Sequence, residues 1–161
     1  MAVVGVEFAK VSYTLADSHF LLREISLRLE AGTTTALLWR SGSGKTTLLR
    51  TVNGLVTPTS GAVRVGDRPA GAYDLVALRR SIGYVIQETG LFPHMTVERN
   101  AGMALELAGR SREEISARAA EVLSLVGLDF AQYRRRYPWQ LSGGQRQRVG
   151  LARALALDPE I

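Results

Sequence analysis

Residues 41–47 combine serines, glycines, a lysine and threonines in one short run. Gly42 and Gly44 let the backbone approach an anion closely, and Lys45 can reach the β- and γ-phosphates of a nucleotide. The hydroxyl of Thr46 is a ligand that Mg²⁺ accepts, and backbone N–H groups at the start of the following helix add positive charge. This chemistry predicts that a nucleotide and Mg²⁺ bind to the phosphate loop, defined by these residues: Ser41, Gly42, Ser43, Gly44, Lys45, Thr46 and Thr47.

One position next to this loop departs from the usual pattern. The pattern is glycine, four variable residues, glycine, lysine and then serine or threonine, and Trp39 occupies the place of its first glycine. A bulky side chain costs on the order of 1 to 3 kcal/mol where the backbone needs a conformation open only to glycine. We therefore expect Trp39 to weaken nucleotide binding.

A second motif with anion-binding chemistry lies about a hundred residues further along the chain. It consists of Leu141, Ser142, Gly143, Gly144 and Gln145. A serine followed by glycines at a helix N-terminus presents backbone N–H groups to an anion. Because the chain has only one lysine-bearing loop, the two half-sites favour a dimer in which each copy completes the site of the other.

These motifs, with a glutamine between them, carry a resemblance to a known family. Gln87 follows the run Gly-Tyr-Val-Ile, the phosphate loop precedes it and the Leu-Ser-Gly-Gly-Gln motif comes after it. In this order they resemble the ATP-binding subunits of ABC transporters, over essentially the whole chain. Residues 90–98 resemble importers, especially those for quaternary amines such as glycine betaine. The resemblance implies that ATP and Mg²⁺ bind, and that ATP hydrolysis drives import.

The resemblance also implies a role for particular residues. Tyr13 would stack on the adenine ring, and Gln87 would lie near Mg²⁺ and sense the membrane subunits. Lys45 and Gln87 are thus the candidate catalytic residues, and Thr46 and Gln87 the candidate metal ligands. In a head-to-tail dimer, residues of the second motif would close over the ATP of the opposite protomer: Ser142, Gly143, Gly144 and Gln145.

The implied partners are integral membrane permease subunits and a second ATP-binding subunit. The chain would then lie peripherally on the cytoplasmic face of the cell membrane, and no nucleic acid is expected. The first eleven residues show no secretory signal, and no apolar run approaches the roughly 18 residues of a membrane-spanning helix.

The elements expected around these motifs define an α/β fold of the P-loop NTPase type. Alternation of apolar residues predicts half-buried strands, whereas residues 33–38 are β-branched and apolar throughout, as in a buried central strand. A helix is expected to begin at Lys45 and to end before Gly54. Strands are expected at residues 4–8, 25–29, 33–38, 62–65 and 82–86.

Helices are predicted beyond Pro93. One spans residues 96–108, one begins at Ser111 and ends at Gly127, and one begins at Ser142. The last two open with capping boxes, because glutamate or glutamine lies three residues after the serine. We therefore predict a single domain, 1–161, with an α/β front at 1–90, a helical subdomain at 91–140, and the second motif with its helix at 141–161.

Composition limits the chemistry further. Without cysteine there is no disulfide, thiolate metal site or cysteine nucleophile. The net charge of +5 is almost wholly due to arginine, since Lys10 and Lys45 are the only lysines, and no acidic residue lies between Asp129 and Asp158. We expect a solvated or subunit-facing arginine surface, with its acidic complement on a segment missing from the chain or on a partner.

In the family that the chain resembles, the strand after the last predicted helix ends in an aspartate that holds Mg²⁺ and a glutamate that activates water. A histidine further on contacts the γ-phosphate. The printed chain ends at Ile161, at the start of that strand, so we expect an incomplete sheet, an exposed sheet edge and little hydrolysis. Two alternatives stay open: a soluble ATPase of this class that acts on nucleic acid or ribosomes, and a fragment that binds a partner without turning over ATP.

Overall fold

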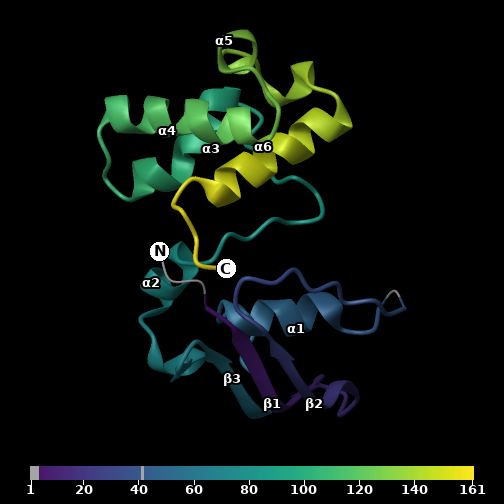
Figure 1. Ribbon diagram of the computed structural model, residues 1–161. Helices are drawn as coiled ribbons and strands as arrows, with labels where there is room; N and C mark the ends of the chain where they lie inside the picture. Colours follow the sequence, from purple (N-terminus) through teal and green to yellow (C-terminus); the bar gives the residue numbers. More distant parts are fainter. Residues whose placement is uncertain (1–3, 41) are drawn as a thin grey trace. The chain divides into compact units, whose positions relative to one another are not determined.

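The computed structural model describes residues 4–40 and 42–161, and the chain forms two compact units (Figure 1). Unit 1 comprises Met1–Ser81 with Glu160–Ile161, and unit 2 comprises Ile82–Pro159. Unit 1 therefore contains the phosphate loop, and unit 2 contains Gln87 and the Leu-Ser-Gly-Gly-Gln motif. None of the described helices has the length and apolar character needed to cross a membrane.

Unit 1 is built on a four-stranded antiparallel sheet in the order β2-β1-β3-β4. Phe8 illustrates the register, since it lies opposite Leu27 on β2 and Val63 on β3 and is only 1% exposed. Helix α1 contributes Leu48 and Val52 to the buried residues. The elements are β1 Val6–Thr14, β2 Phe20–Leu29, α1 Lys45–Val52, β3 Ser60–Val65, β4 Arg68–Pro69, a 3₁₀ turn Ala70–Ala72 and α2 Leu75–Arg80.

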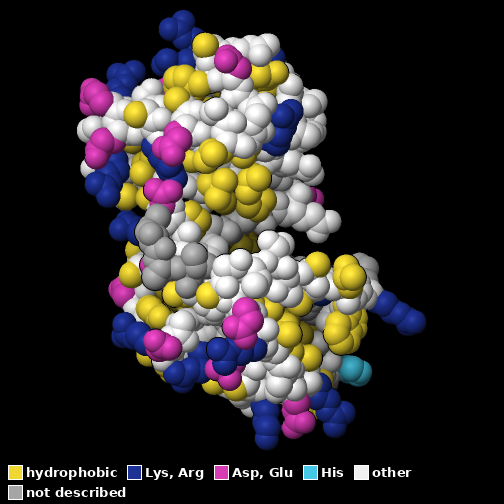
Figure 2. Space-filling model, viewed as in Figure 1, with side chains coloured by type: hydrophobic (Ala, Val, Ile, Leu, Met, Phe, Trp, Pro, Cys, Tyr) yellow, Lys and Arg dark blue, Asp and Glu magenta, His cyan; other side chains and the backbone are white. Residues whose placement is uncertain are grey.

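Two of the predicted strands are absent from the described chain. Residues 33–38 and 82–86 have no strand assignment, and Leu38 is 86% exposed. Hydrophobic side chains are visible on the surface of both units (Figure 2). An apolar, β-branched run gives a segment the propensity of a strand, but the strand also needs a neighbour to pair its N–H and C=O groups. Among the described residues no strand pairs with either segment, so these two predictions are wrong. The strands predicted near residues 4–8, 25–29 and 62–65 are confirmed.

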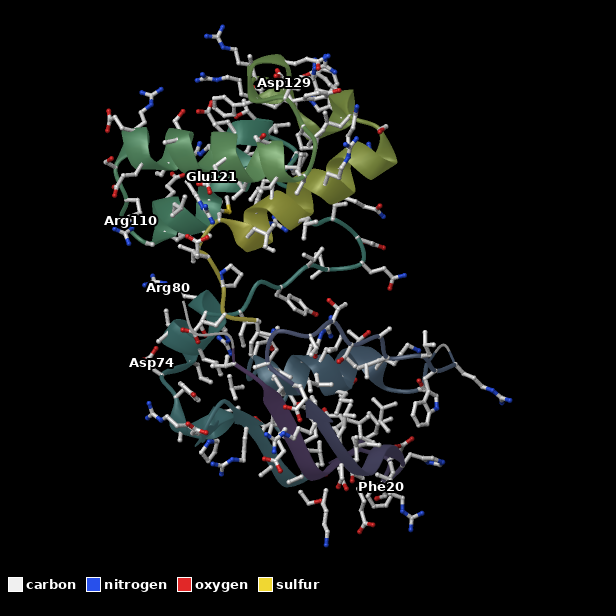
Figure 3. The ribbon with its side chains drawn as sticks, viewed as in Figure 1. Phe20, Asp74, Arg80, Arg110, Glu121 and Asp129 are labelled. Atoms are coloured by element: carbon white, nitrogen blue, oxygen red, sulfur yellow. The ribbon has the colours of Figure 1, made fainter. Side chains whose placement is uncertain are left out.

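Unit 2 is helical, and its core lies where α3, α4 and α6 pack together. The core includes Val97, Val122 and Val149, each with 0% exposure. Asp129 lies at the start of α5 (Figure 3), where its carboxylate accepts a hydrogen bond from the N–H of Gln132. The elements are α3 Val97–Leu107, α4 Arg112–Leu125, α5 Phe130–Tyr133, a 3₁₀ turn Pro138–Gln140 and α6 Gly143–Leu155.

Both predicted capping boxes are present. The Ser111 hydroxyl accepts from the Glu114 N–H at 3.2 Å, and the Glu114 carboxylate accepts from the Ser111 N–H at 2.8 Å. This backbone hydrogen bond from Ser111 lowers the pKa of the Glu114 carboxyl, because it favours the charged form. The start of α4 is thus fixed by two residues that are close in the sequence.

Arginine side chains close the C-terminal ends of several helices. Arg148 donates to the carbonyls of Val126 and Gly127 after α4, at 3.4 and 3.0 Å. Arg118 donates to the carbonyls of Leu155 and Ala156 at the end of α6, at 3.0 and 3.1 Å. Cations are stabilised there by the free carbonyls and the negative end of the helix dipole. Backbone oxygens of the chain itself thus accept from Arg148 and Arg118, and an acidic complement for the arginine surface outside the chain stays a prediction.

Replacing Arg118 by alanine is expected to lower the free energy of unfolding by about 1–2 kcal/mol. The side chain is 17% exposed and also pairs with Glu121 at 2.7 Å and with Asp158, so its removal leaves the end of α6 without its cap. Urea unfolding followed by circular dichroism measures the change. The exposed Arg135 provides the control, for which Arg135→Ala should shift stability by less than about 0.5 kcal/mol. Equal shifts for both variants would contradict the capping role.

Candidate nucleotide-binding site

The phosphate loop has a backbone that requires glycine. Gly42 and Gly44 have φ of 79° and 87°, in the left-handed region that glycine adopts readily. At Gly44 space is limiting too, since a Cβ would lie 2.8 Å from Leu22 Cδ2 and 2.9 Å from the carbonyl oxygen of Leu21. The loop is therefore shaped by strand β2 on one side and by the start of α1 on the other. Ser41, also predicted to belong to the site, lies outside the described residues.

Lys45 folds back over the loop that precedes it. Its Nζ donates to the carbonyl oxygens of Trp39 and Arg40, at 2.9 and 2.7 Å. These two contacts fix the ammonium group at the loop, as expected for a side chain that neutralises phosphate charge. The ammonium group is therefore already ordered before an anion binds. Binding would then cost little side-chain conformational entropy at Lys45.

The N-terminus of α1 has open donors. Among the described residues, no side chain caps this end of the helix and no acidic residue lies in its first turn. The N–H groups of the first turn have no intrahelical acceptor, and they carry the positive end of the helix dipole. Thr46 in this turn is exposed and Thr47 is half-buried. An anion with several oxygen atoms fits this end of the helix.

Ser43 gives an independent sign of a missing acceptor or donor. Its Oγ is buried and has no hydrogen-bond partner within residues 4–40 and 42–161. A buried hydroxyl without a partner costs about 1–3 kcal/mol, so native structures usually satisfy it with protein, water or ligand. A phosphate oxygen at this end of α1 would satisfy it. The residues present thus fit a nucleotide phosphate group.

Trp39 does not carry the strain expected of it. It is not one of the described non-glycine residues with positive φ, so its backbone does not need a glycine-only conformation. Its side chain is 74% exposed and lines a largely apolar groove of about 630 Å³, together with Leu37, Leu48 and Lys45. The expectation of backbone strain at Trp39 is wrong for this structure.

Replacing Trp39 by glycine is therefore expected to change the affinity for Mg-ATP by less than about threefold, which corresponds to roughly 0.6 kcal/mol. The backbone carbonyl that accepts from Lys45 is present in both variants. Isothermal titration calorimetry of the two proteins side by side measures the difference. A gain of tenfold or more in the glycine variant would show that the indole obstructs the loop.

Tyr13 lies in the same unit as the loop. It is half-buried on β1 and is paired with Leu22 of β2, the residue against which Gly44 packs. The sheet therefore places the strand of Tyr13 next to the strand that supports the loop. Stacking of its ring on adenine stays a prediction.

In unit 2, Ser142 and Gln145 form the capping box that begins α6. The Ser142 hydroxyl accepts from the Gln145 N–H at 3.3 Å, and Gln145 Oε1 accepts from the Ser142 N–H at 2.9 Å. Gln145 Nε2 also donates to the Tyr133 hydroxyl at 3.1 Å. The sequence did not point to Tyr133, because this contact depends on how α5 packs against α6.

Gly143 and Gly144 are exposed and have no structural need to be glycine within the described chain. Neither has a positive φ, and a Cβ at either position would meet no described atom within 4 Å apart from its chain neighbours and the backbone of its own helix. Glycine in such a place is typical of a backbone that another molecule approaches closely. The motif therefore combines an exposed glycine backbone with a serine and a glutamine that the capping box orders.

Gln87 is exposed and lies in unit 2, in a segment without regular secondary structure. Thus the structure groups the loop residues with Tyr13, and Gln87 with residues 142–145, in two separate units. Sequence reasoning missed Arg153, which donates to the carbonyls of Thr89 and Gly90, more than sixty residues away. No local pattern could reveal a contact over that separation.

A glycine-shaped phosphate loop opening a helix, within a mixed α/β chain, defines a nucleotide-binding protein of the P-loop type. The sequence model of the ABC transporter family matches residues 22–161. The chain belongs to the ABC transporter family.

Curated relatives and a solved structure agree with this assignment. The osmoprotectant import ATP-binding protein OsmV of Salmonella typhimurium is 42% identical over 137 residues, covering 85% of this chain and 36% of the relative. The methionine import ATP-binding protein MetN of Cereibacter sphaeroides is 47% identical over 143 residues, covering 87% and 40%. The ATP-binding cassette MJ0796, solved as a dimer with ADP and phosphate, is 34% identical with a TM-score of 0.86, covering 96% of this chain and 70% of that one.

These comparisons confirm two sequence predictions, membership of the ABC transporter family and the α/β fold class. The chain spans about two fifths of the length of the two curated relatives.

Proposed function

We propose that the chain is the ATP-binding part of an ABC importer and that it binds Mg-ATP at the phosphate loop. The observation that carries this proposal is the buried Ser43 hydroxyl, which has no hydrogen-bond partner among the described residues and lies beside the N-terminus of α1. Lys45, already held at the loop, would contact the β- and γ-phosphates. The loop residues would hold the phosphate chain through their backbone N–H groups: Gly42, Ser43, Gly44, Thr46 and Thr47.

Mg²⁺, when bound, would neutralise phosphate charge and favour phosphoryl transfer. Thr46 and Gln87 are the residues proposed to hold it, and Tyr13 is proposed to stack on the adenine. Thr46 is well suited to the role because it lies exposed in the first turn of α1. Lys45 and Gln87 would then act on the reacting phosphate, and hydrolysis would drive transport.

We further propose a head-to-tail dimer in which residues 142–145 contact the nucleotide of the opposite subunit. Two observations support this arrangement. Gly143 and Gly144 have no constraint from within the described chain, so their open backbone is available to a partner's ligand. The related cassette MJ0796 was solved as a dimer with ADP and phosphate.

The partners proposed for the whole protein are integral membrane permease subunits, reached from the cytoplasmic face of the membrane. Relatives named for osmoprotectant and methionine import support an importer of small solutes. Among these solutes we propose a quaternary amine such as glycine betaine, on the likeness of residues 90–98 to such importers. We propose that residues 1–161 form a single ATP-binding domain, with an α/β front at 1–90, a helical subdomain at 91–140 and the motif-bearing helix at 141–161.

Affinity purification of the tagged protein from detergent-solubilised membranes tests this function. We expect permease subunits with several membrane-spanning helices to co-purify, and competition assays in proteoliposomes to show uptake of labelled glycine betaine in preference to methionine. A preference for methionine would change the proposed substrate and leave the proposal of an importer standing. Recovery of DNA or RNA that is lost at higher salt would instead favour the nucleic-acid alternative.

A further inference from the structure

Arg153 joins two parts of unit 2 that the sequence places far apart. It lies on α6, and its Nη1 and Nη2 donate to the carbonyl oxygens of Gly90 and Thr89, at 2.7 and 3.0 Å. Those carbonyls belong to the segment that directly follows Gln87. Burial lowers the pKa of the Arg153 guanidinium, because removal from water disfavours the charged form. A desolvated cation needs acceptors, and these two carbonyls supply them.

Glycines allow the same segment to lie directly against α6. A Cβ at Gly150 would lie 3.4 Å from the Thr89 carbonyl oxygen. A Cβ at Gly83 would lie 3.0 Å from the carbonyl oxygen of Ala154 and 2.9 Å from Pro159 Cγ. The segments on both sides of Gln87 therefore pack directly against α6, the helix capped by Ser142.

We propose that Arg153 is a positioning residue that makes the backbone around Gln87 and helix α6 one rigid body. The orientation of Gln87 then follows the orientation of the helix whose N-terminus carries Ser142. This inference rests on the proposed function, in which Gln87 contacts Mg²⁺ and Ser142 contacts nucleotide. Arg153 contacts neither group itself, and acts by holding the segment that presents Gln87.

Arg148 provides a matched control on the same helix. Like Arg153, it donates to two carbonyl oxygens, but those of Val126 and Gly127 after α4. Arg148→Ala and Arg153→Ala thus remove the same kind of contact from α6, and only the second loosens the segment next to Gln87.

The test measures ATP affinity by calorimetry twice, once with Mg²⁺ and once with EDTA, for the unaltered protein and each variant. In Arg153→Ala we expect the gain in affinity from Mg²⁺ to fall by about tenfold, as for other residues that orient a metal-contacting group. Affinity in EDTA should stay within about twofold, a difference of roughly 0.4 kcal/mol. Arg148→Ala should keep the full gain in ATP affinity from Mg²⁺. Arg153→Lys should recover part of this gain, because an ammonium group can still donate to the carbonyls.

A folded Arg153→Ala variant that keeps the full effect of Mg²⁺ would overturn this inference and leave the proposed function standing. An equal loss in Arg148→Ala would also overturn it, because general weakening of α6 would then be the cause. If the unaltered protein bound ATP in neither condition, the proposed function itself would fail, and the inference with it.

Discussion

Replacing Lys45 by alanine is expected to weaken Mg-ATP binding by about a hundredfold. The structure holds the ammonium group at the phosphate loop through the carbonyls of Trp39 and Arg40. A hydrogen bond to a charged group contributes about 1.5–3 kcal/mol, and the side chain can contact two phosphate groups. Truncation to alanine removes these contacts and leaves phosphate charge without its counterion. Isothermal titration calorimetry measures the loss.

Lys10 is the matched control for this experiment, because it is the only other lysine in the chain. It is exposed on β1, and the interaction found for it, at its backbone N–H, does not involve the side chain. Lys10→Ala should leave the affinity for Mg-ATP within about twofold of the unaltered protein, or roughly 0.4 kcal/mol. Equal affinities for the unaltered protein and Lys45→Ala would exclude the phosphate loop as the main binding site.

Replacing Asn100 by alanine is expected to lower the free energy of unfolding by about 3 kcal/mol. The side chain is 0% exposed, and all its hydrogen-bonding groups are used. Its Oδ1 accepts from the Phe92 N–H at 2.8 Å, and its Nδ2 donates to the carbonyls of Phe92, Met95 and Thr96 at 3.0–3.1 Å. Alanine would remove the side-chain partners of the Phe92 N–H and the Met95 carbonyl and open a small cavity, whereas the carbonyls of Phe92 and Thr96 keep the backbone N–H groups of Met95 and Asn100.

Urea unfolding of unit 2 can be followed by circular dichroism, because α3, α4 and α6 all lie in this unit. The exposed Gln147 on α6 serves as the control, and Gln147→Ala should alter stability by less than about 0.5 kcal/mol. A cost below about 1 kcal/mol for Asn100→Ala would show that water replaces the amide without strain.

The helices of unit 2 could be predicted closely because their signals are local. Ser111 and Ser142 begin helices through capping boxes that span three residues, and Gly127 follows α4 with a φ of 70°. Thr96 caps α3 with its side chain alone, by accepting from the Arg99 N–H at 3.3 Å. Each of these signals depends on neighbours in the sequence, so the chain alone is enough to show them.

The strands were predictable only where a partner exists in the described chain. Alternation in residues 4–8 and 25–29 indicated β1 and β2, which pair with each other. Residues 33–38 and 82–86 have the composition of strands, yet composition says nothing about which backbone will pair with them. For the same reason the contact between Arg153 and Thr89 could not be predicted, since it depends on tertiary packing rather than on spacing in the sequence.

The candidate site was only partly visible in the sequence. Motif spacing identified Lys45 and the glycines, and the structure adds the φ values and steric limits that explain Gly44. It also reveals the unpartnered hydroxyl of Ser43 and the open surface at Gly143, neither of which follows from residue type. The prediction of strain at Trp39 failed because backbone conformation was inferred from a motif position alone.

The arginines affect the choice between the proposed functions. Their excess was the only support for an ATPase that acts on nucleic acid. Arg148 and Arg153 instead donate to backbone carbonyls, and Arg134 pairs with Glu98 at 3.2 Å. These three arginines thus have contacts within unit 2 that account for their presence without nucleic acid, which favours the importer proposal.

Amide hydrogen exchange with and without Mg-ATP tests the central claim most directly, because it shows where the nucleotide binds. We predict slower exchange at residues 44–47, where the open N–H groups at the end of the loop and in the first turn of α1 would gain phosphate acceptors. The same protection should be lost in Lys45→Ala. Binding of Mg-ATP with no protection of these residues, or with protection confined to other parts of the chain, would contradict the assignment of the phosphate loop.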